Sequence, residues 1–172
     1  LTAISTHSNL EGLDLDDNNL GRQGSVALGN ALKACRNSRL RKLCLTRNSI
    51  DDEGLRALAD GMRNCQNLKE LELSENALIT VAGFRSLATL FQSEHCHLEQ
   101  LGLESMGIGD DGATALAAGL AELNSLEKLS LHDNSIGGDG ARALATELVN
   151  LRSLETLYLG DNSIGDVGAR SI

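Results

Sequence analysis

The residue types most used in catalysis and metal binding are present in this sequence, but their spacing argues against both. His95, Cys96 and His97 are three potential ligands in a row. Tetrahedral zinc needs three or four ligands that converge from suitably spaced positions, and no partner motif accompanies these three. The serine, histidine and aspartate residues occur without a G-x-S-x-G nucleophile elbow and without a glycine-rich phosphate loop. The sequence therefore predicts no enzyme, no metal site and no cofactor.

The elements that would have to position any functional group come from a repeat. The pattern Leu-x-x-Leu-x-Leu-x-x-Asn-x-Leu occurs in six copies, separated by 30, 28, 30, 28 and 28 residues. A fixed period of this length indicates an array of units, each of which packs mainly on its neighbours. We therefore expect one domain, 1–172, with strands that start near Leu10, Leu40, Leu68, Leu98, Leu126 and Leu154.

The fifth copy shows what one unit should be. Leu129 and Leu131 alternate with polar residues, as in a half-buried strand, whereas Ala141, Leu144 and Leu148 have helical spacing. Strands pair about 4.8 Å apart and helices pack about 8–10 Å apart, so a stack of such units must bend. The sequence predicts an α/β right-handed solenoid, a horseshoe arc with a parallel sheet on the concave face and helices on the convex face.

Residues that recur at fixed positions of the repeat predict the structure of the turns. We expect the amide that follows each strand to satisfy buried backbone groups, and a local irregularity where Met106 takes the place of asparagine. An aspartate two residues before a recurrent glycine, at Asp52, Asp110 and Asp166, is predicted to cap its own helix. One extra residue in the third turn, within ALITVAGF, predicts a bulged loop. The amides concerned are Asn18, Asn48, Asn76, Asn134 and Asn162.

Charge and cysteine usage restrict the partner and the compartment. A net charge of −9 disfavours nucleic acid, which needs a basic patch, and an anionic membrane surface. No apolar run approaches the roughly 18 residues of a membrane span, and the opening residues do not resemble a signal peptide. Cys35 and Cys65 take equivalent places on neighbouring helices, too far apart for a disulfide. With Cys44 and Cys96 they are expected to be reduced, which favours the cytoplasm.

The repeats resemble a known family. Units of 28–30 residues, such as LEKLSLHDNSIGGDGARALATEL and LETLYLGDNSIGDVGARSI, resemble the ribonuclease-inhibitor-like subfamily of leucine-rich repeats from about Leu10 to the end. Members include ribonuclease inhibitor, the sensing domains of NOD-like receptors and activators of the GTPase Ran. The segment CHLEQLGLESMGI is similar to NOD-like receptor repeats. Neither end has a polar capping repeat, so we expect an excerpt of a longer array, truncated at both ends.

The resemblance implies a non-enzymatic protein-binding module of a larger intracellular protein of the NOD-like-receptor type. A GTPase activator of the Ran type and an inhibitor of a basic enzyme are the alternatives. In each case the binding residues would lie between the leucines of the concave strands, where thirteen carboxylates meet five cations. Such a face can attract a basic protein, although solvated strands also carry charge without binding anything.

The cations of the second repeat, Arg41, Lys42 and Arg47, are predicted to neutralise acids on adjacent strands; a mixed-charge contact site is the other interpretation. Tyr158, the single tyrosine, projects from the same face, and tyrosine is common in binding hot spots. The candidate partner-binding residues are Asp14, Asp16, Arg41, Arg47, Glu72, Glu75, Glu104, His132, Asp133, Tyr158 and Asp161.

Overall fold

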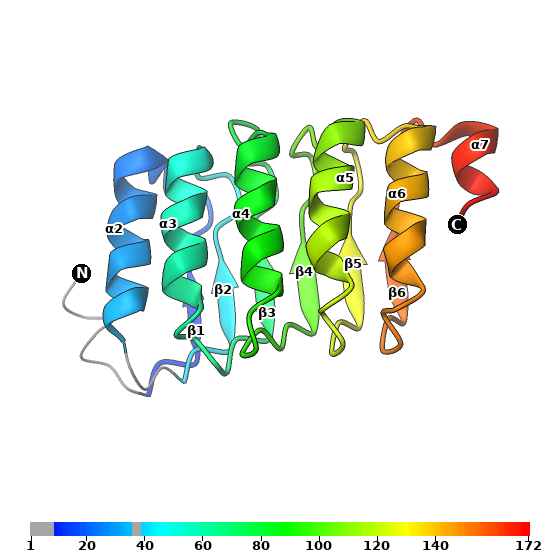
Figure 1. Ribbon diagram of the computed structural model, residues 1–172. Coiled ribbons are helices and arrows are strands. Elements are labelled where there is room, and N and C mark those ends of the chain that lie inside the picture. Colours follow the sequence, from blue (N-terminus) through cyan, green and yellow to red (C-terminus); the bar gives the residue numbers. More distant parts are fainter. Residues whose placement is uncertain (1–8, 36–38) are drawn as a thin grey trace.

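The computed structural model describes residues 9–35 and 39–172, and these form six successive repeats of strand, turn and helix (Figure 1). Repeat 1 consists of β1 and α2, and each later repeat adds the next strand and helix. The strands are β1 (Gly12–Asp14), β2 (Lys42–Cys44), β3 (Glu70–Glu72), β4 (Gln100–Gly102), β5 (Lys128–Ser130) and β6 (Thr156–Tyr158). The helices are α2 (Gly21–Ala34), α3 (Asp52–Met62), α4 (Val81–Phe91), α5 (Gly109–Leu120), α6 (Gly138–Leu148) and α7 (Gly165–Ala169).

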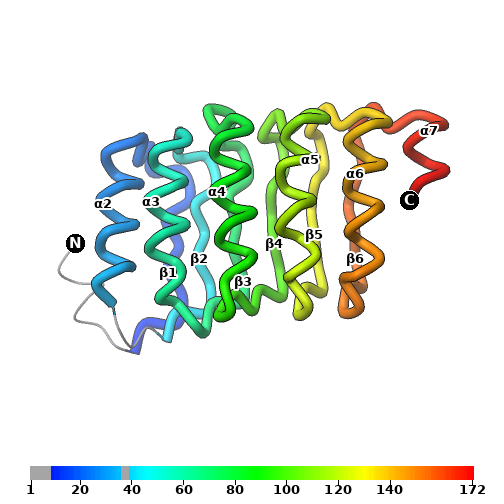
Figure 2. The backbone as a smooth tube through the Cα atoms, viewed as in Figure 1, coloured from blue at the N-terminus to red at the C-terminus, as the bar shows by residue number. Residues whose placement is uncertain are grey.

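The strands pair in chain order into one parallel sheet, and the helices cover one of its faces. In both views of the backbone the row of helices extends past the row of strands at the two ends of the array (Figures 1 and 2). This is the arrangement expected when closely spaced strands lie on the inner side of an arc and wider helices on the outer side. The predicted α/β repeat solenoid is confirmed.

The leucines of the repeated pattern form the core. Leu43, Leu71, Leu101 and Leu129, at the centres of β2 to β5, are at most 2% exposed and lie in register with one another. Burying one such side chain stabilises the fold by roughly 1.5–3 kcal/mol. A strand of only three residues is therefore held in place by the side chains stacked on either side of it.

The asparagines that follow the strands connect one repeat to the one before it. Asn48 Oδ1 accepts hydrogen bonds from the backbone N–H groups of Asn18 and Leu20, both at 3.2 Å. Its Nδ2 donates to the carbonyl oxygens of Leu15 (2.7 Å) and Thr46 (3.0 Å). Asn76, Asn134 and Asn162 bond the preceding repeat in the same way. The predicted role of satisfying buried backbone groups is confirmed for these four amides, although the repeat that they join is the preceding one and not the next. Among the described residues, the side chain of Asn18 bonds only the Asp16 carbonyl of its own repeat.

The irregularity expected around Met106 and the bulge expected in the third turn are one feature. Met106 is 1% exposed and cannot accept the bonds that an asparagine would take from repeat 3. There the extra residue turns Leu78 outward, 60% exposed, and buries Ile79 instead. Ile79 donates its N–H to the Asn76 carbonyl (3.1 Å), and Leu78 forms an isolated bridge with Asp51. The leucine of the sequence pattern is thus not the core residue of this turn.

The prediction that aspartates cap their own helices was wrong for Asp52 and Asp110. Asp52 accepts from the N–H groups of Thr80 (2.7 Å) and Gly83 (3.0 Å), at the start of the next helix. Asp110 likewise accepts from the N–H groups of Gly137 (2.7 Å) and Gly140 (2.9 Å). The recurrent glycine is needed because a Cβ at Gly83 would lie 2.6 Å from the Asp52 carboxylate.

Asp51 and Asp166 also lie at the starts of helices. Helix α3 is capped by the preceding residue, since Asp51 accepts from the Gly54 N–H at 2.9 Å. This hydrogen bond is the main cause that lowers the pKa of Asp51, and the ion pair with Arg22 acts in the same direction. Asp166 lies in the first turn of α7, in the place that Asp52 and Asp110 occupy in their helices.

Candidate functional site

The concave face consists of the side chains that lie between the buried leucines of β1 to β6 and in the turns directly after these strands. The sheet register aligns them in rows across the array. One row contains Asp14, Cys44, Glu72, Gly102, Ser130 and Tyr158. A ligand on this face would meet equivalent positions of neighbouring repeats together.

The sequence pattern suggested that all side chains between the leucines face solvent, but three of them are buried. Cys44 and Ser130 are 4% exposed and Ser74 is 6% exposed. These side chains are small, and strands about 4.8 Å apart let the longer side chains of adjacent rows cover them. Burial raises the pKa of the Cys44 thiol to about 11, so this cysteine is a packing residue.

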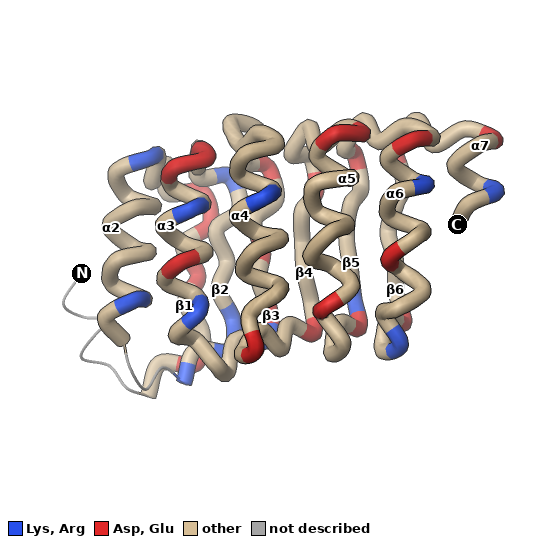
Figure 3. Tube along the Cα trace, in the orientation of Figure 1, with Lys and Arg blue, Asp and Glu red and all other residues tan. Residues whose placement is uncertain are grey.

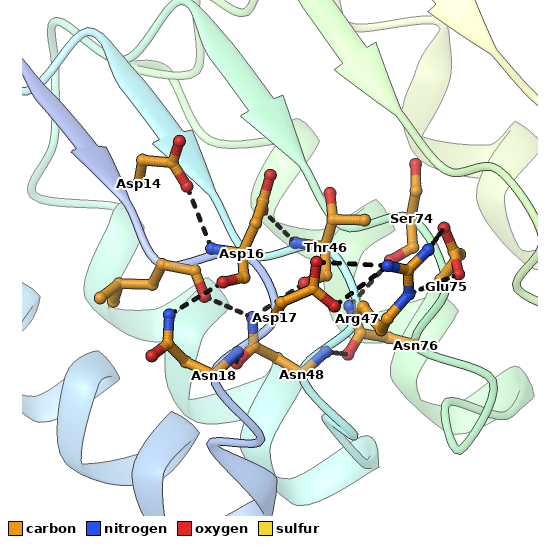
Figure 4. A network of polar contacts seen from close by, with 11 residues as sticks. Asp14, Asp16, Asp17, Asn18, Thr46, Arg47, Asn48, Ser74, Glu75 and Asn76 are labelled. Carbon is orange, nitrogen blue, oxygen red and sulfur yellow. Dashed lines mark hydrogen bonds and ion pairs between the residues drawn. The ribbon is translucent and has the colours of Figure 1, made fainter.

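In repeats 1 to 3 the acids of the concave face are held by cations. Arg47, in the turn after β2, donates from Nη1 to Asp17 (3.1 Å) and from Nε and Nη2 to the two carboxylate oxygens of Glu75 (2.8 and 2.6 Å). Figure 4 shows the guanidinium between these two carboxylates, which come from the adjacent turns. The interpretation of Arg47 as a cross-strand neutralising residue is confirmed.

Three further acids of these repeats also have partners. Lys42 pairs with Glu70 on the next strand, while Lys69 of repeat 3 pairs with Glu99 of repeat 4 at 2.8 Å. Two aspartates accept from backbone N–H groups (Figure 4): Asp14 from Asp16 (3.0 Å) and Asp16 from Thr46 (2.6 Å). Of the cations predicted to neutralise adjacent strands, Arg41 is the exception: among the described residues its guanidinium has no ion pair.

In repeats 4 to 6, three carboxylates of the concave face are held by neutral hydroxyls or by histidine. Ser130 donates its hydroxyl to Glu104 (2.6 Å), and Ser105 donates its hydroxyl to Asp133 (2.8 Å). His132 Nε2 lies 3.2 Å from Asp161 Oδ2. A hydroxyl orients a carboxylate without removing its charge, so this part of the face keeps the negative charge that repeats 1 to 3 have neutralised.

Glu72 lies at the boundary between the two halves and is the most perturbed acid of the concave face. It projects over Gly102, where an added Cβ would collide with its carboxylate oxygens. Among the described residues nothing forms a hydrogen bond or ion pair with this carboxylate. Burial is the main cause that raises the pKa of Glu72, and the charges of Glu70 and Glu104 raise it further. A cation delivered from outside would stabilise its ionised form.

Tyr158 lies at the far end of the face and has a neighbour that the sequence interpretation did not select. Lys128 Nζ is 5.4 Å from the centroid of the Tyr158 ring, and the tyrosine remains 47% exposed. The register pairs Ser130 with Tyr158 and Lys128 with Thr156. Counting one residue on from the central leucine of each strand would have placed Ser130 beside Tyr158, but it would not have predicted the diagonal contact from Lys128.

The structure gives no support to chemistry elsewhere in the described chain. In residues 9–35 and 39–172 no three His, Cys, Asp or Glu side chains are placed to hold a metal ion. Burial raises the pKa of Cys96 to about 11, which keeps it as the unreactive thiol at neutral pH. Over the same residues no helix is both long and apolar enough to cross a membrane.

These features define a class of protein: a solenoid of strand–turn–helix repeats that exposes one polar, concave sheet face. A family model described as Leucine Rich repeat matches residues 36–59, 64–88, 94–117, 122–145 and 150–172. The chain belongs to the leucine-rich repeat family. Comparison with curated proteins gave no match. Repeats of this family are typically non-enzymatic and suggest a protein–protein interaction module.

Proposed function

We propose that the chain is a protein-binding module that holds a basic segment of its partner on the half of the concave face formed by repeats 4 to 6. One observation carries the proposal. In repeats 1 to 3, Asp17 and Glu75 are bonded to Arg47 and Asp16 is bonded to a backbone N–H group, whereas Glu104 and Asp133 of repeats 4 and 5 are bonded only to hydroxyls. A lysine or arginine from a partner would take the place that Arg47 fills in repeat 2.

The neighbouring residues support the same partner chemistry. Glu72 forms no ion pair with a described residue and has a raised pKa. A cation from the partner would lower that pKa, and this stabilisation of the carboxylate would contribute to binding. Tyr158 adds an exposed aromatic surface of the type that is frequent in hot spots. Electrostatic attraction of this kind speeds association and weakens with salt.

The broader setting is part of the proposal. The period of 28–30 residues and the segment CHLEQLGLESMGI support a place in a larger cytoplasmic protein that resembles NOD-like receptors. Cys44 and Cys96, which burial keeps as thiols at neutral pH, agree with a reducing compartment. The repeats would then supply ligand recognition, and any catalytic step would belong to other parts of the protein.

A charge-removal experiment tests the site. A fluorescent lysine-rich peptide should bind the chain in low salt, and the double variant Glu104→Gln with Asp133→Asn should weaken binding by roughly tenfold. The matched control, Asp111→Asn with Glu122→Gln, removes the same charge from exposed positions at the start and just past the end of α5. Equal weakening by both double variants would reduce the effect to net charge and refute the site.

A gain-of-charge variant tests the comparison with Arg47 directly. Ser105 occupies in repeat 4 the turn position that Arg47 occupies in repeat 2, and their φ angles are 52° and 54°. Ser105→Arg should therefore fit the backbone and place a guanidinium near Glu75 and Asp133. We expect it to displace the lysine-rich peptide while the folded state is retained. Unchanged peptide affinity in the folded variant would contradict the proposal.

A further inference from the structure

A polar depression of about 320 Å³ lies at the edge of the concave face, where the strands begin and the helices end. It is lined by Glu11, Arg39, Arg41 and Asn67, from the segments that lead into β1, β2 and β3. In Figure 3, Lys and Arg segments lie at the lower ends of α2 and α3 and at the start of β2. The volume falls at the lower end of the ~300–1,000 Å³ range of small-ligand sites.

The two arginines of this depression differ from those that serve the fold. Arg22 and Arg47 each pair with two carboxylates of neighbouring repeats. Within the described part of the chain no carboxylate lies within ion-pair distance of Arg39 or Arg41. In a protein with a net charge of −9, two guanidinium groups that line one depression and form no ion pair with a described carboxylate are available to an external anion.

The backbone holds these arginines in place. Leu40, between them, is 2% exposed and anchors the segment in the core. The Arg41 N–H donates to the Glu11 carbonyl (2.7 Å), and the Arg41 carbonyl accepts from the Lys69 N–H (2.8 Å). Only the side chains remain to be ordered by a ligand, which lowers the entropic cost of binding.

We propose that Arg39 and Arg41 form a binding site for the phosphate group of a phosphorylated protein partner. A guanidinium presents its N–H donors in a planar fork that matches two oxygens of a phosphate. Two such forks suit a dianion with three terminal oxygens better than they suit a single carboxylate. The site is independent of the basic-segment proposal, because it is formed by repeats 1 to 3 rather than by repeats 4 to 6 and selects the opposite charge.

The charge of Glu11 predicts the sign of a further effect on phosphate binding. Its carboxylate lines the same depression and must repel a bound phosphate. Removing this charge by Glu11→Gln should therefore increase the affinity for phosphate. If the depression does not bind anions, the substitution should not produce such an increase. An effect in this direction does not arise from loss of folding.

Nuclear magnetic resonance titration of the ¹⁵N-labelled chain with O-phosphoserine tests the site. We expect shifts of the Arg39 and Arg41 side-chain and backbone N–H signals, about tenfold weaker binding in Arg39→Gln with Arg41→Gln, and tighter binding in Glu11→Gln. The matched control is Arg152→Gln, which removes an exposed arginine from the equivalent edge of repeat 6 and should leave phosphoserine affinity unchanged.

Three outcomes would overturn the proposal. Phosphoserine could leave the Arg39 and Arg41 signals unmoved, or Arg152→Gln could weaken binding as much as the double variant does. Glutamate could bind as tightly as phosphoserine, which would make the site one for carboxylates. Binding to vesicles that contain phosphatidic acid, without binding to phosphoserine, would equally remove a phosphorylated protein as the ligand.

Discussion

The two halves of the concave face share a scaffold and differ in how their acids are balanced. In repeats 1 to 3, Arg47 joins the carboxylates of Asp17 and Glu75 across three turns. In repeats 4 to 6 the corresponding turn residue is Ser105, and Asp133 receives only its hydroxyl. The residue at this one turn position therefore decides whether the carboxylates of the adjacent turns are neutralised within the chain or keep their charge for a partner.

This difference indicates where function can vary in a repeat protein. The leucine and asparagine positions are fixed by burial and by backbone hydrogen bonds, so they recur in both halves, with Met106 of repeat 4 as the exception. The turn position of Arg47 and Ser105 has a positive φ in each case but faces solvent, and accepts either residue. Three predictions separate the common scaffold from the differing surface, in order of decreasing effect.

The largest effect should come from the scaffold and should be equal in the two halves. Asn48 and Asn134 are both fully buried, and each makes four hydrogen bonds to backbone groups. Replacing either by alanine leaves several buried groups unpaired and should cost roughly 3–5 kcal/mol. Urea denaturation followed by circular dichroism measures both.

The control for the asparagines is Asn18→Ala, because Asn18 is exposed and its side-chain amide donates only to the Asp16 carbonyl. It should cost under about 1 kcal/mol. If Asn48→Ala and Asn134→Ala differed from each other by more than they differ from this control, the halves would not share one scaffold.

The second prediction is an intermediate loss of stability that differs between Asp110→Ala and Asp52→Ala. Asp110→Ala removes the acceptor for the Gly137 and Gly140 N–H groups, and Gly137 has no side chain to replace it. It should cost about 1–2 kcal/mol, the usual range for a lost helix cap. Asp52→Ala should cost less, since Thr80 also accepts from Ala82 (3.3 Å) and partly caps α4 by itself.

Hydrogen exchange distinguishes the two aspartates. In Asp110→Ala, faster exchange should be confined to the first turn of α6, one repeat beyond the substitution. Fast exchange in α5 instead would mean that Asp110 caps its own helix after all. A larger loss of stability in Asp52→Ala than in Asp110→Ala would show that Thr80 does not compensate.

The sequence predicted the repeat, the leucine core and the role of the asparagines, because each rests on a spacing that recurs. Prediction from the sequence failed where residues of two repeats together determine the local structure. The partner of Asp52 lies 28 residues on, at Thr80, and a local rule for helix caps cannot reach it. Likewise Ile79 replaces Leu78 in the core because an inserted residue and the absent amide at Met106 act on the same turn.

For the concave face the sequence predicted which residues lie there but not how deep they lie or what neutralises them. Ser130 and Cys44 are buried because longer side chains of neighbouring rows cover them. The pairing of Arg47 with Asp17 and Glu75 follows from the register and could be predicted. The isolation of Glu72 could not, since it depends on Gly102, which lets the carboxylate fold down onto the sheet.

The smallest effect concerns Glu72 and depends on pH. Its folded-state pKa is raised, mainly by burial, so the folded chain binds the proton more tightly than the unfolded chain does. Stability is therefore lost as the pH rises through this pKa. Glu72→Gln should raise the free energy of unfolding at neutral pH, and the gain should vanish in acid, where glutamate is protonated in both states.

Glu75→Gln is the matched comparison, because Glu75 lies in the turn that follows the same strand and is paired with Arg47. It should give no gain at neutral pH, since it removes a favourable ion pair rather than an isolated charge. Urea denaturation at about pH 4 and about pH 7, values on either side of the range in which a raised glutamate titrates, measures both variants. A gain for Glu75→Gln as large as that for Glu72→Gln would mean that Arg47 does not neutralise its half of the face, and the distinction between the halves would fail.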